Sequence, residues 1–183
     1  MHFGHVGLGL ATLVSCALSG CDDPEPATDA KSVDGKICGY LSPALIESIV
    51  GHDDAAAAGD EIVPADERAD REQECAVVDG NRTVVLAQVH DAPSTRPGHD
   101  AAPLDNCVRL DDLADWTGSV CWSDSSMRAT VWPDNGARLL EVSYFPEGGG
   151  ADKVDTRDEL VHVTVSLARD VEANIKSYDE RHQ

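Results

Sequence analysis

Two His-Asp pairs have side chains that could bind a metal. His90-Asp91 and His99-Asp100 lie in or beside a proline-rich stretch. Imidazole and carboxylate groups together are ligands for several transition metals, but this spacing on a loop is more typical of solvated side chains. The acidic residues between positions 53 and 61 lack the alternating ligands and the glycine of a dedicated calcium loop. We therefore predict no metal site.

Motifs for the common catalytic chemistries are missing from the chain. It has no Gly-x-Ser-x-Gly elbow and no His-Glu-x-x-His helix, and the glycines at 148–150 are not followed by the Lys-Ser/Thr of a phosphate-binding loop. We predict that the protein is not an enzyme and carries no cofactor. A hydrolase whose catalytic residues come from scattered positions is a lesser alternative.

A cysteine near the start of the chain indicates a different chemistry, the attachment of a lipid. Residues 3–18 are almost entirely apolar or glycine. They are too short and too interrupted by glycine for a membrane-spanning helix, and they suit the apolar region of a secretory signal better. Leu18-Ser19-Gly20-Cys21 resembles the lipobox of bacterial lipoproteins, although residues 1–7 lack the usual Lys or Arg. That resemblance implies a signal peptide at 1–20 and a diacylglycerol on the sulfur of Cys21.

An acidic segment follows the predicted lipid anchor. Residues 21–37 contain proline, glycine and acidic side chains, with few apolar ones. Such a composition cannot bury enough apolar surface to fold alone, so we predict a disordered tether that holds a domain off the bilayer. The expected location is the extracytoplasmic face of the cell membrane.

Four cysteines remain in the exported part of the chain. In an oxidising compartment they predict two disulfides. Three pairings are possible, and the sequential one, Cys38–Cys75 with Cys107–Cys121, is favoured because each bridge then ties neighbouring elements across a polar loop. A zinc site is the rival interpretation, but no pair has the short spacing of a zinc knuckle.

The charge of the chain limits its partners. The formal net charge is −20 over 183 residues. Nucleic acid is excluded as a partner because its phosphates need a basic surface, and the domain itself should not adhere to an anionic membrane. Cationic ligands, proteins, metal ions or simple solubility remain.

The first predicted elements are a helix and a strand pair. Ser42 as N-cap, Pro43 at the first helical position and Gly51 as the stop predict a helix over 43–50. The charged stretch 52–74 is expected to be a long loop. Residues 75–90 then form two strands around the turn Asp79-Gly80-Asn81.

The second half predicts a meander and a long helix. After a loop at 91–106 and a short helical turn near 110–116, three apolar segments between 118 and 145 are separated by turn residues. Val131 and Leu140 are assigned to the covered face, while Trp122 and Trp132 suit either core or rim. The last helix starts at a capping box, Thr156 with Glu159. Its apolar residues recur every three or four positions: Leu160, Val163, Leu167, Val171, Ile175 and Tyr178.

Together these elements predict an α+β domain. An antiparallel sheet of about five strands is covered by an N-terminal and a C-terminal helix and is held by two disulfides. The domain is expected over 38–179, with 180–183 as a tail. Residues 52–74 and 91–106 would supply its large loops.

The motif Cys38-Gly39-Tyr40-Leu41-Ser42-Pro43, behind a lipobox and a tether and ahead of Cys75, supports a family resemblance. It is similar to a family of uncharacterised small actinobacterial lipoproteins, in which Cys-x-x-Leu-Ser/Thr-Pro opens a disulfide-linked α+β domain. A weaker similarity is to the extracellular sensor domains of mycobacterial receptor kinases. Both resemblances imply a binding or interaction role at the cell surface, and neither supplies a catalytic residue.

The resulting functional prediction is a membrane-anchored binding or interaction module. One alternative is a small-ligand carrier or sensor with a pocket between sheet and loops. The other is docking onto an envelope protein through the acidic loops, which the shortage of aromatic residues (three Trp, three Tyr and two Phe) favours mildly.

Overall fold

The computed structural model describes residues 32–68, 71–91, 105–110, 116–133, 138–147 and 154–183. Along them the elements follow in the order β1 (Ser32–Val33), β2 (Lys36–Ile37), α1 (Pro43–Val50), β3 (Ala56–Gly59), α2 (Ala65–Arg68), β4 (Glu72–Asp79), β5 (Arg82–Asp91), β6 (Cys107–Arg109), β7 (Thr117–Trp122), β8 (Met127–Trp132), β9 (Arg138–Tyr144) and α3 (Val154–Arg181).

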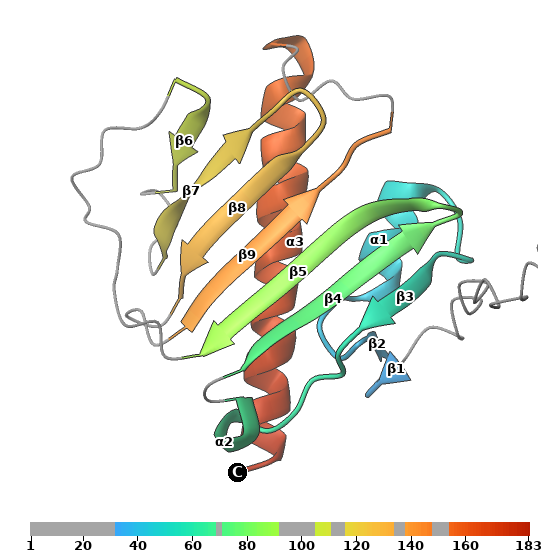
Figure 1. Cartoon of the computed structure of the whole chain (residues 1–183), viewed down its shortest axis with the longest axis vertical. Helices are drawn as coiled ribbons and strands as arrows, with labels where there is room; N and C mark the ends of the chain where they lie inside the picture. The colour runs from blue at the N-terminus through green and yellow to red at the C-terminus, as the bar shows by residue number, and fades with distance from the viewer. Residues whose placement is uncertain (1–31, 69–70, 92–104, 111–115, 134–137, 148–153) are drawn as a thin grey trace, which may run out of the picture.

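The described strands build one large antiparallel sheet and a separate hairpin. Seven strands lie in the order β3-β4-β5-β9-β8-β7-β6, while β1 pairs only with β2. The sheet is therefore two meanders, β3 to β5 and β6 to β9, joined in the middle where β5 pairs with β9. Figure 1 shows the strands running diagonally across the long helix α3, which lies behind them.

The core lies between the sheet and α3. Val131 and Leu140, which the sequence assigns to the covered face, are fully buried and sit opposite each other on β8 and β9. The predicted apolar stripe of α3 meets them, and its Leu167, Val171 and Ile175 are fully buried as well. Burying each of these side chains contributes about 1.5–3 kcal/mol.

Helix α1 forms where it is predicted, over Pro43–Val50. Ser42 is extended at the N-cap position, but its side chain makes no capping hydrogen bond, and Gly51 ends the helix with φ 89°. Ile46 reaches the core. The helix has eight residues and does not pack along the strands as α3 does. The expectation of a sheet covered by both terminal helices is therefore corrected, because α3 supplies the cover.

The sheet is also larger than the predicted five strands. Strand β3 and helix α2 both fall in the stretch 52–74 that is predicted to be a loop. The sequence of β3 is Ala-Ala-Ala-Gly, which carries no apolar alternation, so only its pairing with β4 identifies it as a strand. A Cβ at Gly59 would lie 2.2 Å from the carbonyl oxygen of Glu74, so the two backbones approach too closely for another residue.

Strand β6 is the second strand of the sheet that the sequence did not predict. It pairs Cys107 with Cys121 at the far edge of the sheet. The predicted helical turn lies almost wholly in residues 111–115, outside the described residues.

Regular secondary structure begins before Cys38, the predicted start of the domain. Asp34 and Gly35 have φ of 54° and 73°, and they form the two-residue turn of the β1–β2 hairpin. Ile37 is already buried. The expectation of a disordered tether is therefore wrong for residues 32–37, while residues 21–31 lie outside the described residues.

The ends of α3 differ slightly from prediction. The helix begins at Val154, so Thr156 lies inside the first turn rather than at the N-cap. It ends at Arg181, two residues beyond the predicted end of the domain.

Both disulfides are present with the predicted sequential pairing. Cys38–Cys75 joins the segment before α1 to β4 and is fully buried. Cys107–Cys121 joins the two facing residues of β6 and β7, whose Cα atoms are 4.0 Å apart.

Candidate functional site

Strand alternation places a second set of side chains on the sheet face opposite α3. Figure 1 shows this face toward the viewer, with α1 and α3 both behind the sheet. We call it the open face. The register of the ladder gives its members as Glu72, Glu74, Ala76, Leu86, Gln88, His90, Leu139, Glu141, Ser143, Arg128, Thr130, Trp132, Thr117, Ser119, Cys121, Cys107 and Arg109.

A row of polar side chains crosses the open face in register. Six neighbouring strands each place one residue in it, and every one of these residues is exposed or half-buried. The row runs from β4 to β6 as Glu74, Gln88, Glu141, Thr130, Ser119 and Arg109. An antiparallel sheet with one solvated face should alternate in this way.

Hydrogen bonds hold part of this row in place. The Gln88 amide donates to Glu72 at 3.0 Å and to Glu74 at 3.2 Å. The Thr130 hydroxyl donates to Glu141 at 3.2 Å. These cross-strand bonds reduce the conformational freedom that the carboxylates would lose on binding a partner.

The open face separates its charges along the sheet. Glu72, Glu74 and Glu141 give the β4, β5 and β9 part a negative charge. Arg128 on β8 and Arg109 on β6 give the other side a positive charge, and Arg128 donates to a hydroxyl on β9 at 3.2 Å. A surface of this kind selects partners by electrostatic complementarity.

Trp132 and Trp122, which the sequence allowed to lie either in the core or at its rim, occupy different places. Trp132, the last residue of β8, is buried on the open face, and its indole N–H has no hydrogen-bond partner in the described structure. Trp122 is half-buried on the covered face, and the guanidinium of Arg157 lies 4.9 Å from the centre of its ring.

The metal candidates are not brought together in the part of the chain that can be described. His90 lies beside Glu72, with 3.7 Å between Nε2 and the carboxylate, while His99-Asp100 falls in 92–104, outside the described residues. Asp54 and Asp60 lie on either side of β3, so the strand separates them. Over the described ranges, no three His, Cys, Asp or Glu residues are grouped so that they could hold a metal ion.

A cavity of about 360 Å³ between α1 and α3 collects residue types found in hydrolases: Ser48, Tyr144, Glu159, His162 and Ser166. Ser48 donates its hydroxyl hydrogen to a backbone carbonyl in its own helix, and Ser166 does the same to the carbonyl of His162. A serine nucleophile must instead donate to a basic side chain. The cavity therefore lacks an activated serine.

Tyr144 in that cavity has an altered acidity. Burial raises the pKa of its phenol above 10.0, the Arg82 guanidinium lowers it, and the Glu159 carboxylate raises it. Burial has the largest effect, because it penalises the charged phenolate. The phenol therefore stays protonated at neutral pH, where it can donate a hydrogen bond but cannot act as a phenolate base.

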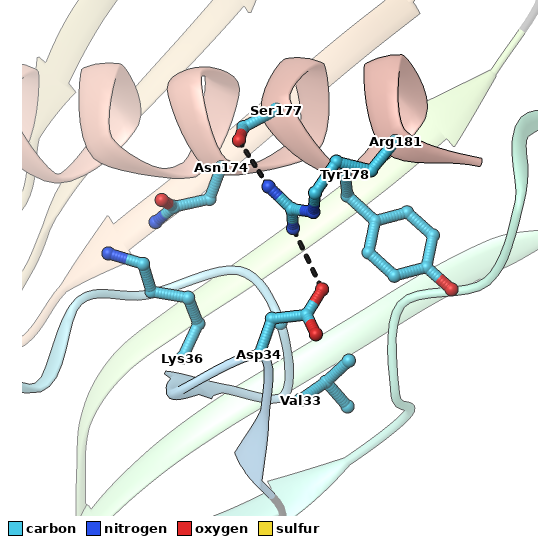
Figure 2. Close-up of a pocket in the computed structure, with 8 residues that line it drawn as sticks. Val33, Asp34, Lys36, Asn174, Ser177, Tyr178 and Arg181 are labelled. Carbon is cyan, nitrogen blue, oxygen red and sulfur yellow. Dashed lines mark hydrogen bonds and ion pairs between the residues drawn. The ribbon is translucent and has the colours of Figure 1, made fainter. Parts of the chain in front are cut away.

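A second cavity, of about 260 Å³, lies between the β1–β2 hairpin and the C-terminal part of α3. We call it the hairpin–helix pocket. Figure 2 shows Arg181 reaching across it, with its guanidinium between Ser177 and Asp34. Arg181 donates to Asp34 at 2.7 Å and to Ser177 at 2.5 Å. The lining residues are Val33, Asp34, Lys36, Gly39, Asn174, Ser177, Tyr178 and Arg181.

Lys36 enters the same pocket from β2. Its ammonium group donates to the Ser42 hydroxyl at 2.9 Å, and that hydroxyl donates to Asp170 on α3 at 2.5 Å. The backbone N–H of Ser42 also donates to Asp170. One carboxylate on α3 thereby holds the start of α1 and the base of the hairpin, and this explains why Ser42 does not cap its own helix.

A buried ionic network joins α2, β9 and α3. Arg68 on α2, which is 1% exposed, donates two hydrogen bonds of 2.7 Å to Asp179 on α3. Arg138 at the start of β9 binds Asp179 and Glu172 at 3.2 Å each. Since all four groups are paired within the protein, we assign them to positioning α2 and α3.

The sequence-predicted lipidation site, Cys21, lies outside the described residues. The hairpin–helix pocket was missed by the sequence analysis, which placed residues 21–37 in the tether. The Asp34-Gly35 dipeptide is the strongest short signal for a hairpin turn and would have revealed β1 and β2. Pairing of the hairpin with Arg181 has no local sequence signal.

Comparisons with known proteins do not identify the chain: no family model, no curated protein and no solved structure matches it. In the described part of the chain, none of the helices combines the length and the apolar character needed to cross a membrane.

Proposed function

We propose that this protein is a lipid-anchored extracytoplasmic module that docks an envelope protein through its open face. One observation carries the proposal. A row of polar residues runs in register across a sheet face that carries neither α1 nor α3. The location rests on the lipobox at Leu18-Ser19-Gly20-Cys21.

The size of the open face suits a protein rather than a small molecule. Seven strands at a spacing of about 4.8 Å are about 29 Å across, and strands of six residues are about 20 Å long. The product, about 600 Å² in projection, is close to the roughly 800 Å² that one partner contributes to a standard interface.

The charges on the open face indicate the chemistry of that partner. Its acidic side calls for a basic surface, with an acidic patch placed to meet Arg128 and Arg109. A domain with a net charge of −20 would also attract a basic partner over distance and raise the association rate.

Site-specific crosslinking in the native host tests the docking. A photo-crosslinking side chain at Gln88 should trap a single partner, whereas one at Ala173, exposed on α3, should not. The double charge reversal Glu74→Lys/Glu141→Lys should abolish the Gln88 crosslink. Equal crosslinking at both positions, or a crosslink that survives the reversal, would rule out docking through the open face.

The membrane anchor needs its own test. The wild-type chain should incorporate labelled palmitate and sediment with membranes, and Cys21→Ala should lose both properties. Label incorporation that persists in Cys21→Ala would disprove the anchor without affecting the docking proposal, because the crosslinking contrast between Gln88 and Ala173 is independent of it.

A second candidate function is small-ligand binding. The sequence-based form of this alternative places the pocket between the sheet and the loops, and most of 91–106 lies outside the described residues. The hairpin–helix pocket is a different location, and its polar lining favours a specific ligand class.

A further inference from the structure

We propose that the hairpin–helix pocket binds a small zwitterion of the α-amino-acid type, with the ligand carboxylate between Lys36 and Arg181 and its ammonium group against Asp34. This is a second binding site, remote from the open face, and it does not depend on the docking proposal.

The charges around the pocket argue for a zwitterion over a simple anion. Lys36 and Arg181 are positive, but each already has an acidic neighbour. Asp34 binds Arg181 directly, and Asp170 is connected to Lys36 through the Ser42 hydroxyl. These four groups sum to zero. A lone anion would have to compete with Asp34 for Arg181, whereas a zwitterion offers the same carboxylate and also gives Asp34 a cation.

Hydrogen-bonding capacity remains on the groups that would hold the ligand. Arg181 uses one terminal nitrogen for Ser177 and the other for Asp34, and Lys36 donates to Ser42. Both side chains carry more N–H donors than these bonds use, and the Asp34 carboxylate can accept further bonds. Arginine and lysine together are well suited to bind a carboxylate.

The size and the walls of the pocket restrict the ligand. Its volume of about 260 Å³ is below the range of roughly 300–1,000 Å³ for drug-sized ligands. Figure 2 shows Asn174 and Ser177 lining it from α3, with Val33 on the opposite side. The Asn174 amide donates to the backbone carbonyl of Tyr40 at 2.8 Å, which fixes its orientation. A small polar molecule with a short side chain fits this lining.

Titration of the full ¹⁵N-labelled exported chain, followed by NMR, tests the proposal with three matched probes. L-alanine carries both charges, propionate lacks the ammonium group, and ethylammonium lacks the carboxylate. L-alanine should shift the amide signals of Gly35, Lys36 and Ser177 in a saturable manner. Each half-probe should bind at least tenfold more weakly.

Variants locate the binding. Arg181→Gln and Asp34→Asn should each weaken L-alanine binding at least tenfold, and Asn at position 34 tolerates the positive φ of that turn. Arg169→Gln, which removes an exposed arginine elsewhere on α3, should leave the affinity unchanged.

Two results would overturn the proposal. One is the absence of saturable L-alanine shifts at the pocket of a folded wild-type chain. The other is propionate binding as tightly as L-alanine, which would make the pocket an anion site. Unchanged spectra away from the pocket in the variants show that the fold is intact.

Discussion

The two ends of the sheet are held by different means. Beside the β3 edge, the N-terminal corner (residues 32–50, the β1–β2 hairpin and α1) attaches to the rest mainly through side chains and one disulfide, Cys38–Cys75. At the other end, β6 and β7 form a regular backbone ladder, and Cys107–Cys121 joins two residues that already face each other in it.

This difference predicts which of the two disulfides contributes more to the stability of the folded protein. A bond between strands that are already paired restricts the unfolded chain but adds little order to the native one. A bond between the corner and β4 also holds together elements that have few backbone hydrogen bonds between them. The corner carries the hairpin–helix pocket, so its attachment also determines the shape of that site. Two disulfide variants test this contrast, and three single substitutions test other contributions to stability.

Removing the buried disulfide should have the largest effect. Cys38→Ala/Cys75→Ala releases a loop spanning 37 residues, which corresponds to about 4 kcal/mol of lost stability by loop entropy. The lost sulfur packing in the core adds to this. Urea unfolding followed by tryptophan fluorescence measures the change. A loss no greater than that of the second disulfide would contradict the contrast.

The next largest loss of stability should come from breaking the buried ionic network. Arg68→Met leaves Asp179 paired with Arg138, and losing one member of a buried pair costs about 3–5 kcal/mol. We expect about 3 kcal/mol, because Arg138 still compensates Asp179.

The matched control for this substitution is Arg181→Met, which removes an exposed ion pair with Asp34 and should cost under about 1 kcal/mol. Equal losses in the two variants, measured by the same urea unfolding, would mean that burial does not set the energy of these pairs.

Removing the second disulfide should matter less. Cys107→Ala/Cys121→Ala opens a loop spanning 14 residues, worth at most about 3 kcal/mol by the same entropy argument. Amide hydrogen exchange should show loosening confined to β6 and β7. Faster exchange in α1 or the β1–β2 hairpin would show that the two ends are coupled.

The smallest effect on stability should come from the ionisation of Tyr144. Since burial raises its pKa in the folded protein above the unfolded value near 10.0, the folded state holds the phenolic proton more tightly. The resulting contribution to stability is present below pH 10 and is lost as the pH rises through the folded pKa.

Ultraviolet difference titration of the wild type against Tyr144→Phe measures the ionisation. The difference signal should have its midpoint above pH 10. A midpoint at or below the value for free tyrosine would contradict the burial of this side chain.

Much of the fold could be predicted because its signals are local. The turn at Asp79-Gly80-Asn81, the boundaries of α1 and the apolar stripe of α3 each lie within one short segment. The sequential disulfide pairing also followed from neighbouring elements. Strand β3 was missed because alanine and glycine carry almost no strand preference. It becomes a strand through its partner β4.

The candidate sites were harder to predict for the same reason. The row on the open face joins residues from six strands, and its members meet only when β5 pairs with β9. The hairpin–helix pocket joins Asp34 to Arg181 across almost the whole chain. No local pattern specifies contacts at such separations.

The sequence alone therefore determined most of the local elements and the acidic character, favoured the sequential disulfide pairing and led to the expectation of a lipid anchor at Cys21. Each of these depends on a residue type or on neighbours within a few positions. The tertiary structure decided that seven strands form one sheet, that α3 covers a single face, and that Lys36, Asp34 and Arg181 share a cavity. Those outcomes depend on which apolar surfaces bury one another, a property of the folded chain as a whole.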